Sequence, residues 1–163
     1  MADAIATAPA ETPLTKRFLQ LWHDPGDEPY GIVYAVTEAF PEPLVAELKA
    51  MIPQLPEVVR ARLAGADSEA QDVVRVLVGL LGCIRGGVCD LACDALVAVG
   101  RDALPFLDAA RTFGYEVDMK DGRNTLVLVG ERALWEKMVR KAAMAIDPKR
   151  GNVVQRIVAK LFT

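Results

Sequence analysis

Serine and histidine are almost absent from this chain of 163 residues, in which Ser68 and His23 are each the only residue of their kind. A Ser–His–Asp hydrolase would have to build its triad from these two residues. Each has a structural interpretation instead. Ser68 begins the segment S-E-A-Q as a helix cap, with Gln71 at the third position of a capping box, and His23 lies in the last turn of an expected helix, where a cation favours the helix dipole. We therefore expect no catalytic residue.

Glycine-rich phosphate-binding motifs are also missing. The turn Arg85-Gly86-Gly87 precedes an expected helix, but it matches neither G-x-x-x-x-G-K-[ST] nor G-x-G-x-x-G after a strand. Its glycines are better explained by a sharp turn between two closely packed helices. We expect no cofactor.

Long apolar runs are absent as well. The densest run, VVRVLVGLLGCI at residues 73–84, contains Arg75 and is shorter than the ~20 residues that a membrane-spanning helix needs. Residues 1–12 show no basic start followed by an apolar core, and three cysteines cannot form a fully paired disulfide framework. These features predict a cytoplasmic protein that does not associate with a membrane.

Aromatic residues make up only 6% of the chain, whereas hydrophobic residues make up 52%, dominated by Ala, Val and Leu. This composition favours packed helices over a β-sandwich. We predict a flexible tail at 1–11 and a single, mostly α-helical domain at 12–163, with about eight helices partly stacked as antiparallel hairpins. The expected helices cover residues 12–23, 42–52, 55–65, 68–84, 88–99, 103–111, 131–146 and 152–162.

Two segments depart from the helical pattern. Residues 115–129 alternate apolar and polar side chains around an Asp-Gly turn, which predicts one β-hairpin. Residues 30–40 contain β-branched and aromatic residues that suit a strand. We favour a helix there, with Val33, Val36 and Phe40 facing inward, and the strand remains the alternative.

All three cysteines lie within residues 83–93. On a helix, Cys89 and Cys93 align with Val97 beside the main apolar face, and cysteine commonly packs as a small buried hydrophobe. We therefore interpret the cysteines as part of the core. A metal site made of Cys83, Cys89, Cys93 and His23 would supply a ligand set that zinc accepts, and a redox-active disulfide is a third interpretation.

Residues 87–111, GVCDLACDALVAVGRDALPFLDAAR, resemble the helix-to-helix junction of HEAT-type repeats. The features are Ala95-Leu96 and Gly100 at the end of one helix and Ala103, Pro105 and Leu107 at the start of the next. This resemblance implies a non-catalytic scaffold that presents a helical surface to a protein or a nucleic acid.

Charge is distributed unevenly along the chain. Residues 1–130 contain 11 Lys/Arg and 19 Asp/Glu, whereas residues 131–163 contain 8 Lys/Arg and only 3 Asp/Glu. The two helices expected within residues 131–163 form a basic C-terminal pair. Their cations could be the solvated face of amphipathic helices, opposite the acidic remainder of the chain, or a surface that contacts phosphates. The candidate interaction residues are Arg140, Lys141, Lys149, Arg150, Arg156 and Lys160.

These observations predict a non-catalytic interaction or scaffold subunit of a larger assembly, with a protein partner or a second copy of the chain. One alternative is an accessory protein that binds nucleic acid through its basic C-terminal third. Another is a metal-binding or redox-active protein that uses the cysteine cluster.

Overall fold

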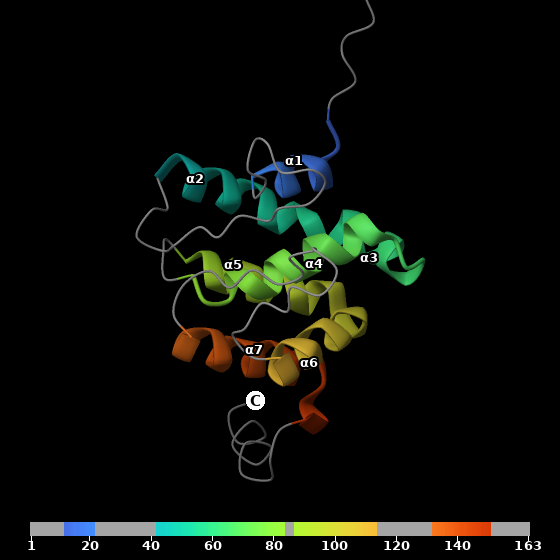
Figure 1. The fold of residues 1–163 in the computed structure, drawn as a ribbon, viewed down its shortest axis with the longest axis vertical. Helices are drawn as coiled ribbons and strands as arrows, with labels where there is room; N and C mark the ends of the chain where they lie inside the picture. The colour runs from blue at the N-terminus through green and yellow to red at the C-terminus, as the bar shows by residue number, and fades with distance from the viewer. Residues whose placement is uncertain (1–11, 22–41, 84–86, 114–131, 151–163) are drawn as a thin grey trace, which may run out of the picture.

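The computed structural model describes residues 12–21, 42–83, 87–113 and 132–150, which are drawn in colour in Figure 1. These residues are mostly helical, as the sequence predicts, and they contain no strand. The expected number of about eight helices is not reached within these ranges, because the expected helix at 152–162 lies outside them. The segment 30–40 and the predicted hairpin at 115–129 also lie outside the described residues. The α-helices are α1 (Leu14–Gln20), α2 (Glu42–Met51), α3 (Leu55–Ala64), α4 (Ser68–Leu80), α5 (Val88–Val99), α6 (Leu104–Phe113) and α7 (Arg132–Ile146). The 3₁₀ helices are η2 (Ile52–Gln54), η3 (Gly100–Ala103) and η5 (Pro148–Arg150).

The helices are arranged in layers around α4. Figure 1 shows α1 and α2 at one end, α4 and α5 in the middle, and α6 and α7 at the other end. Helix α4 contacts α1, α3, α5, α6 and α7. From Val73 to Leu80 every residue of α4 except Arg75 is buried. The apolar composition of this segment on nearly every side therefore correctly predicts the most central helix.

The connection between α3 and α4 is short and tightly hydrogen-bonded. The amide of Ala66 donates to the carbonyl of Leu63 at 3.0 Å, and the amide of Asp67 donates to the carbonyl of Arg62 at 3.1 Å. This pair of hydrogen bonds is the Schellman arrangement, which satisfies free carbonyl groups at the C-terminal end of a helix. Asp67 is the N-cap of α4, because its side chain accepts a hydrogen bond from the Ala70 amide at 2.9 Å. The prediction that Ser68 caps this helix was therefore wrong by one residue: the neighbouring carboxylate accepts the bond, and Ser68 is the first helical residue.

Glycines mark both ends of α5. Gly87 precedes the helix with φ of 77°, and Gly100 ends it with φ of 86°. Backbone angles of this kind are strained for residues that carry a Cβ atom. Gly100 is therefore the C-terminal cap that the sequence predicts, and Pro105 lies in the first turn of α6, also as expected.

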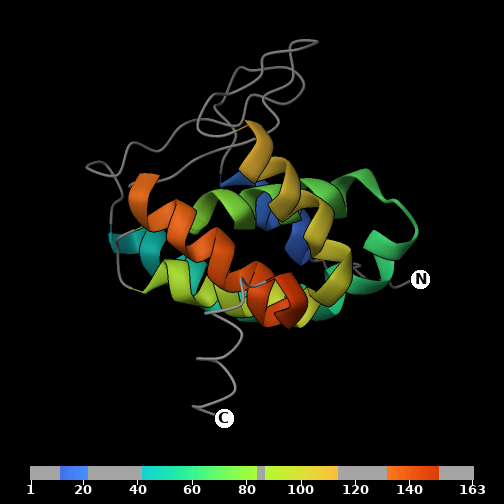
Figure 2. The same ribbon diagram turned by 90° about the horizontal axis from the view of Figure 1, so that it is seen from below.

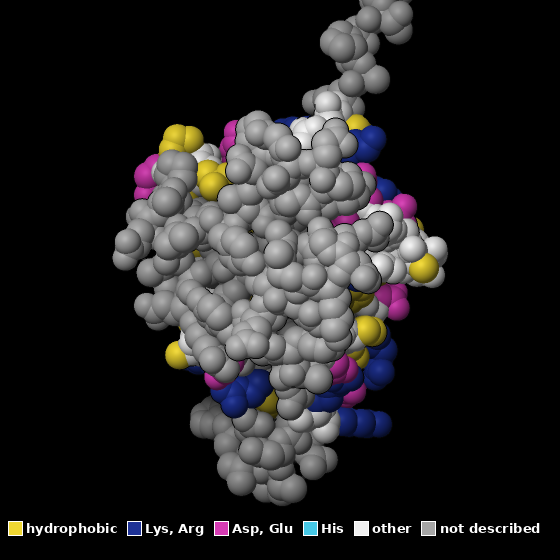
Figure 3. Space-filling model, in the orientation of Figure 1, with side chains coloured by type: hydrophobic (Ala, Val, Ile, Leu, Met, Phe, Trp, Pro, Cys, Tyr) yellow, Lys and Arg dark blue, Asp and Glu magenta, His cyan; other side chains and the backbone are white. Residues whose placement is uncertain are grey.

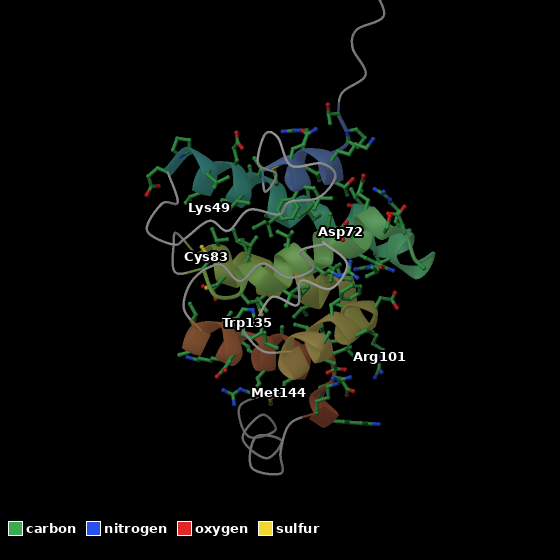
Figure 4. All side chains as sticks on the ribbon, in the orientation of Figure 1. Lys49, Asp72, Cys83, Arg101, Trp135 and Met144 are labelled. Atoms are coloured by element: carbon green, nitrogen blue, oxygen red, sulfur yellow. The ribbon has the colours of Figure 1, made fainter. Side chains whose placement is uncertain are left out.

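Side chains connect helices that are distant in the sequence. The Trp135 indole nitrogen of α7 donates to the Val78 carbonyl of α4 at 2.9 Å, and Figure 4 shows this side chain between the two helices. The Arg75 guanidinium of α4 lies over the Phe106 ring of α6, 5.4 Å from its centroid. These contacts attach the layer of α6 and α7 to the central helix, and so position the outer surface of α7.

None of the described helices has the length and apolar character required to cross a bilayer.

Candidate interaction surface on helix α7

Helix α7 is amphipathic, and its two faces have different roles. Its inner face packs against α5 and α6 through buried side chains. These buried residues are Trp135, Met138, Val139, Ala142 and Ala143. The view in Figure 2, turned by 90° from that of Figure 1, shows α7 and α6 as the outermost helices on that side of the molecule.

The opposite face of α7 carries three cations and a methionine. Lys137, Arg140 and Lys141 are exposed, and Met144 is half-buried. Their spacing of three, four and seven residues from Lys137 places them on one side of the helix, within two turns. We call these four residues the α7 face. Figure 4 shows Met144 on the side of α7 that points away from α4.

The α7 face borders an open hollow in the surface. The hollow has a volume of about 500 Å³, and the described residues that line it are the four residues of the α7 face. Figure 3 shows Lys and Arg side chains gathered around the end of the molecule that α7 and η5 form. The hollow therefore combines positive charge with an apolar surface.

Among the described residues, the three cations of the α7 face have no carboxylate partner, whereas several arginines elsewhere in the protein do. Arg62 pairs with Asp67 and Glu69, each at 3.0 Å, and Arg75 pairs with Asp72 at 2.9 Å. In the described part of the chain, Lys137, Arg140 and Lys141 form no ion pair within 4.0 Å. None of the described carboxylates therefore neutralises their charge.

Two other predicted interaction residues, Lys149 and Arg150, lie outside the α7 face. Lys149 is exposed in η5. Arg150 forms ion pairs with Asp108 of α6 and with Asp147, and its hydrogen bond to Asp108 raises the pKa of its guanidinium. Arg150 therefore holds η5 against α6. Arg156 and Lys160 lie outside the described residues.

Sequence reasoning did not single out Lys137 or Met144. The helical spacing of Lys137, Arg140 and Lys141 is a signal that could have added Lys137. The same spacing could have added Met144, which lies four residues after Arg140, whereas Met138 falls with Trp135 on the apolar side of the helix.

The cysteines lie mainly in the core, as predicted. Cys83 and Cys93 are 1% and 3% exposed, and Cys89 is half-buried on α5. Burial raises the pKa of the Cys89 thiol, and the neighbouring Asp90 carboxylate raises it further. Burial also raises the pKa of the Cys93 thiol, which the Lys141 ammonium only partly offsets. Both thiols are therefore protonated near neutral pH.

The described residues contain no group of three or more His, Cys, Asp and Glu side chains arranged to hold a metal ion. His23, the fourth member of the zinc alternative, lies outside these residues. No site of this kind is therefore assembled from the part of the chain that the structure describes.

The comparisons with known proteins identify no relative. No protein-family model matches the chain, and no curated protein or solved structure is significantly similar to it. The assignment of a function therefore depends on the surface chemistry described above.

Proposed function

We propose that this protein is a non-catalytic interaction subunit that binds an acidic segment of a partner protein through the α7 face. The observation that carries this proposal is the group of three exposed cations on successive turns of α7, none of which pairs with a carboxylate of the described chain. Unpaired charges of one sign, presented on a rigid helix, attract a partner of the opposite sign and orient it.

Several features favour a protein over a nucleic acid as the partner. The chain has a net charge of −3, so that its overall field repels a nucleic acid with many phosphates more strongly than a short segment with a few carboxylates. The described residues lining the hollow include no aromatic side chain on which a base could stack. The exposed Asp90 and Asp94 of α5 lie near the α7 face, because their carboxylates and the Lys141 ammonium all act on the Cys93 thiol. A phosphate backbone that extended beyond α7 in this direction would meet like charge.

The resemblance of residues 87–111 to a HEAT-type junction implies a function of the same class. In the structure these residues contain α5, η3 and most of α6, and α5 and α6 both contact α7. A scaffold of packed helices that presents one helix face to a partner is consistent with that resemblance.

The test uses the tagged full-length protein and two charge-reversal variants. In the α7 variant, Lys137, Arg140 and Lys141 are each replaced by Glu. In the scattered control, the exposed Arg17, Lys49 and Arg101 of α1, α2 and η3 are replaced by Glu, so that the net charge changes equally. Circular dichroism establishes that both variants are folded.

Each protein is incubated with native lysate, with and without nuclease, and the bound proteins are identified by mass spectrometry. We expect the wild type and the scattered control to retain the same stoichiometric partner after nuclease treatment, and the α7 variant to lose it. A partner that all three proteins retain equally would contradict the proposal. Bound material that disappears with nuclease would support the nucleic-acid alternative instead.

A further inference from the structure

The α7 face separates charge from apolar surface along the helix axis. Lys137, Arg140 and Lys141 occupy its N-terminal half, and Met144 follows one turn after Arg140 and Lys141. With a rise of 1.5 Å per residue, Met144 lies about 10 Å along the axis from Lys137. A ligand that uses the whole face must therefore present its negative charge and its apolar group about two turns apart.

The surroundings of Met144 are suited to an apolar group. Met144 lies opposite the buried face of α7 and is half-buried, and it lines the hollow together with Lys137, Arg140 and Lys141, whose side chains contain methylene stems. Such stems cover apolar surface while their charged ends remain in water. Methionine is itself flexible and polarisable, and it adapts to different apolar partners. A fully hydrated anion such as a phosphate would leave this apolar surface unused.

We infer that the partner segment is an acidic amphipathic helix, with carboxylates one turn apart and one apolar side chain placed against Met144. This inference rests on the proposed function. Carboxylates three or four residues apart on a helix have the same axial spacing as the cations of α7. An apolar residue one turn further on reaches Met144 when the two helices lie side by side, which is the arrangement in which amphipathic helices bind surface grooves.

The test measures the binding of fluorescent peptides to the purified full-length protein by anisotropy. The parent peptide is a helix of about 16 residues with Glu pairs four residues apart and one Leu a turn further on. In a second peptide Leu is replaced by Ala, in a third every Glu is replaced by Gln, and a single-stranded DNA of equal charge serves as the polyanion. The protein variants are Met144→Ala and, as a matched control, Val58→Ala, which shortens an exposed apolar side chain of α3 that is 39% exposed.

We expect the parent peptide to bind more tightly than the other three probes. Replacement of Leu by Ala should weaken binding about fivefold to tenfold, as expected for the loss of a few partly buried carbon atoms. The Met144→Ala variant should bind the parent peptide more weakly by a similar factor. Its affinity for the Ala peptide should equal that of the wild type, because the Leu replacement and the Met144 replacement remove the same contact. Val58→Ala should affect neither.

The other outcomes overturn the inference in distinguishable ways. Equal affinity for the Leu and Ala peptides would show that Met144 is not an anchor, while the proposed function would stand. Failure of every peptide to bind would overturn the acidic helix as the ligand, and the pull-down with the α7 variant would still decide the proposed function. Tighter binding of the DNA than of the parent peptide would contradict both.

Discussion

Ala66 adopts a backbone conformation that its own chemistry disfavours. Its φ is 58°, in the left-handed region, whereas Gly65 beside it has φ of −84°. Alanine thus occupies the position of the Schellman arrangement that requires a left-handed backbone conformation. The glycine occupies the preceding position, whose backbone conformation any residue can adopt. A residue with a Cβ atom in the left-handed region costs about 1–2 kcal/mol.

Exchange of these two residues should stabilise the protein. In the double variant Gly65→Ala and Ala66→Gly, a Cβ atom at position 65 meets only the Arg62 carbonyl oxygen, at the ordinary contact distance of 3.5 Å. We expect the free energy of unfolding in urea to rise by about 1 kcal/mol. The exchange leaves the composition unchanged, so that flexibility of the unfolded chain contributes little. A loss of stability would show that Ala66 is not strained.

The cysteines should differ in their reactivity toward iodoacetamide. Near pH 7, raised thiol pKa values leave little thiolate. We expect half-buried Cys89 to be alkylated more slowly than a free thiol, and Cys83 and Cys93 to react only when urea unfolds the protein. Mass spectrometry after trypsin digestion assigns each site. Rapid modification of Cys93 in the folded protein would contradict the buried placement, and acceleration by a chelator would support the zinc alternative.

At the scale of the elements, the attachment of α7 to α4 depends on one buried polar contact. The Val78 carbonyl lies near the C-terminal end of α4, where helix carbonyls lack their usual partners. It accepts hydrogen bonds from the Leu81 amide at 3.3 Å and from the Trp135 indole at 2.9 Å. Trp135, which is 2% exposed, therefore contributes both apolar area and a hydrogen bond between two helices.

Trp135→Phe retains an aromatic ring but removes the indole N–H. We expect it to lower the free energy of unfolding by about 1–3 kcal/mol, since a buried carbonyl loses a partner and a larger ring is replaced by a smaller one. Urea denaturation followed by far-ultraviolet circular dichroism measures this change. Val58→Ala on the surface should shift stability by only about 0.5 kcal/mol. If both variants were equally stable, the Trp135 hydrogen bond would have no net effect on stability.

At the scale of the whole molecule, one polar cluster joins the N-terminal helix to the central ones. The buried Thr15 hydroxyl of α1 donates to the Glu69 carboxylate of α4 at 2.5 Å and accepts from Arg62 of α3 at 3.0 Å. Burial alone would raise the pKa of Glu69, but the hydrogen bonds from Thr15 and Arg62 outweigh it and lower the pKa. The Ala70 amide is the main cause of the lowered pKa of Asp67.

Acidification should therefore lower the free energy of unfolding, because it protonates the carboxylates of this cluster. A carboxylate whose pKa is lower in the folded state binds fewer protons there than in the unfolded chain, so that stability increases with pH. This contribution is complete above the ordinary pKa of Glu69, 4.5, and is lost as the pH falls through its lower folded value. In urea titrations between about pH 6 and pH 3, Glu69→Gln should show a shallower loss of stability than the wild type. Glu57→Gln, which removes a carboxylate at an exposed position of α3, serves as the matched control.

Most of the helical architecture could be predicted from periodicity, and most of the polar contacts could not. The apolar pattern from Val73 to Leu80 indicates a central helix because burial on all sides requires apolar residues on all sides. The choice of Asp67 over Ser68 as the cap could not be decided, since both residue types are good caps and the Arg62 partner is revealed only by folding. The pairing of Thr15 with Glu69 joins positions 54 residues apart, and no local pattern encodes it.

The outer surface of α7 was only partly predictable for the same reason. The sequence shows that the C-terminal third is basic, but it does not show which cations are neutralised by the rest of the chain. Arg150 is paired with Asp108 across two elements, whereas Arg140 and Lys141 are unpaired in the described residues. Tertiary packing thus determines which cations of the basic C-terminal third pair with carboxylates of the described chain and which do not.

The central place of α4 has a consequence for the synthesis of the protein. The ribosome releases residues 68–80 before α5, α6 and α7 exist, yet those helices are among the ones that cover α4. A nascent or prematurely terminated chain that ends before residue 132 therefore leaves the part of α4 that α7 contacts exposed to solvent. Such intermediates are prone to aggregation, so the yield of folded protein depends on how rapidly α7 is translated.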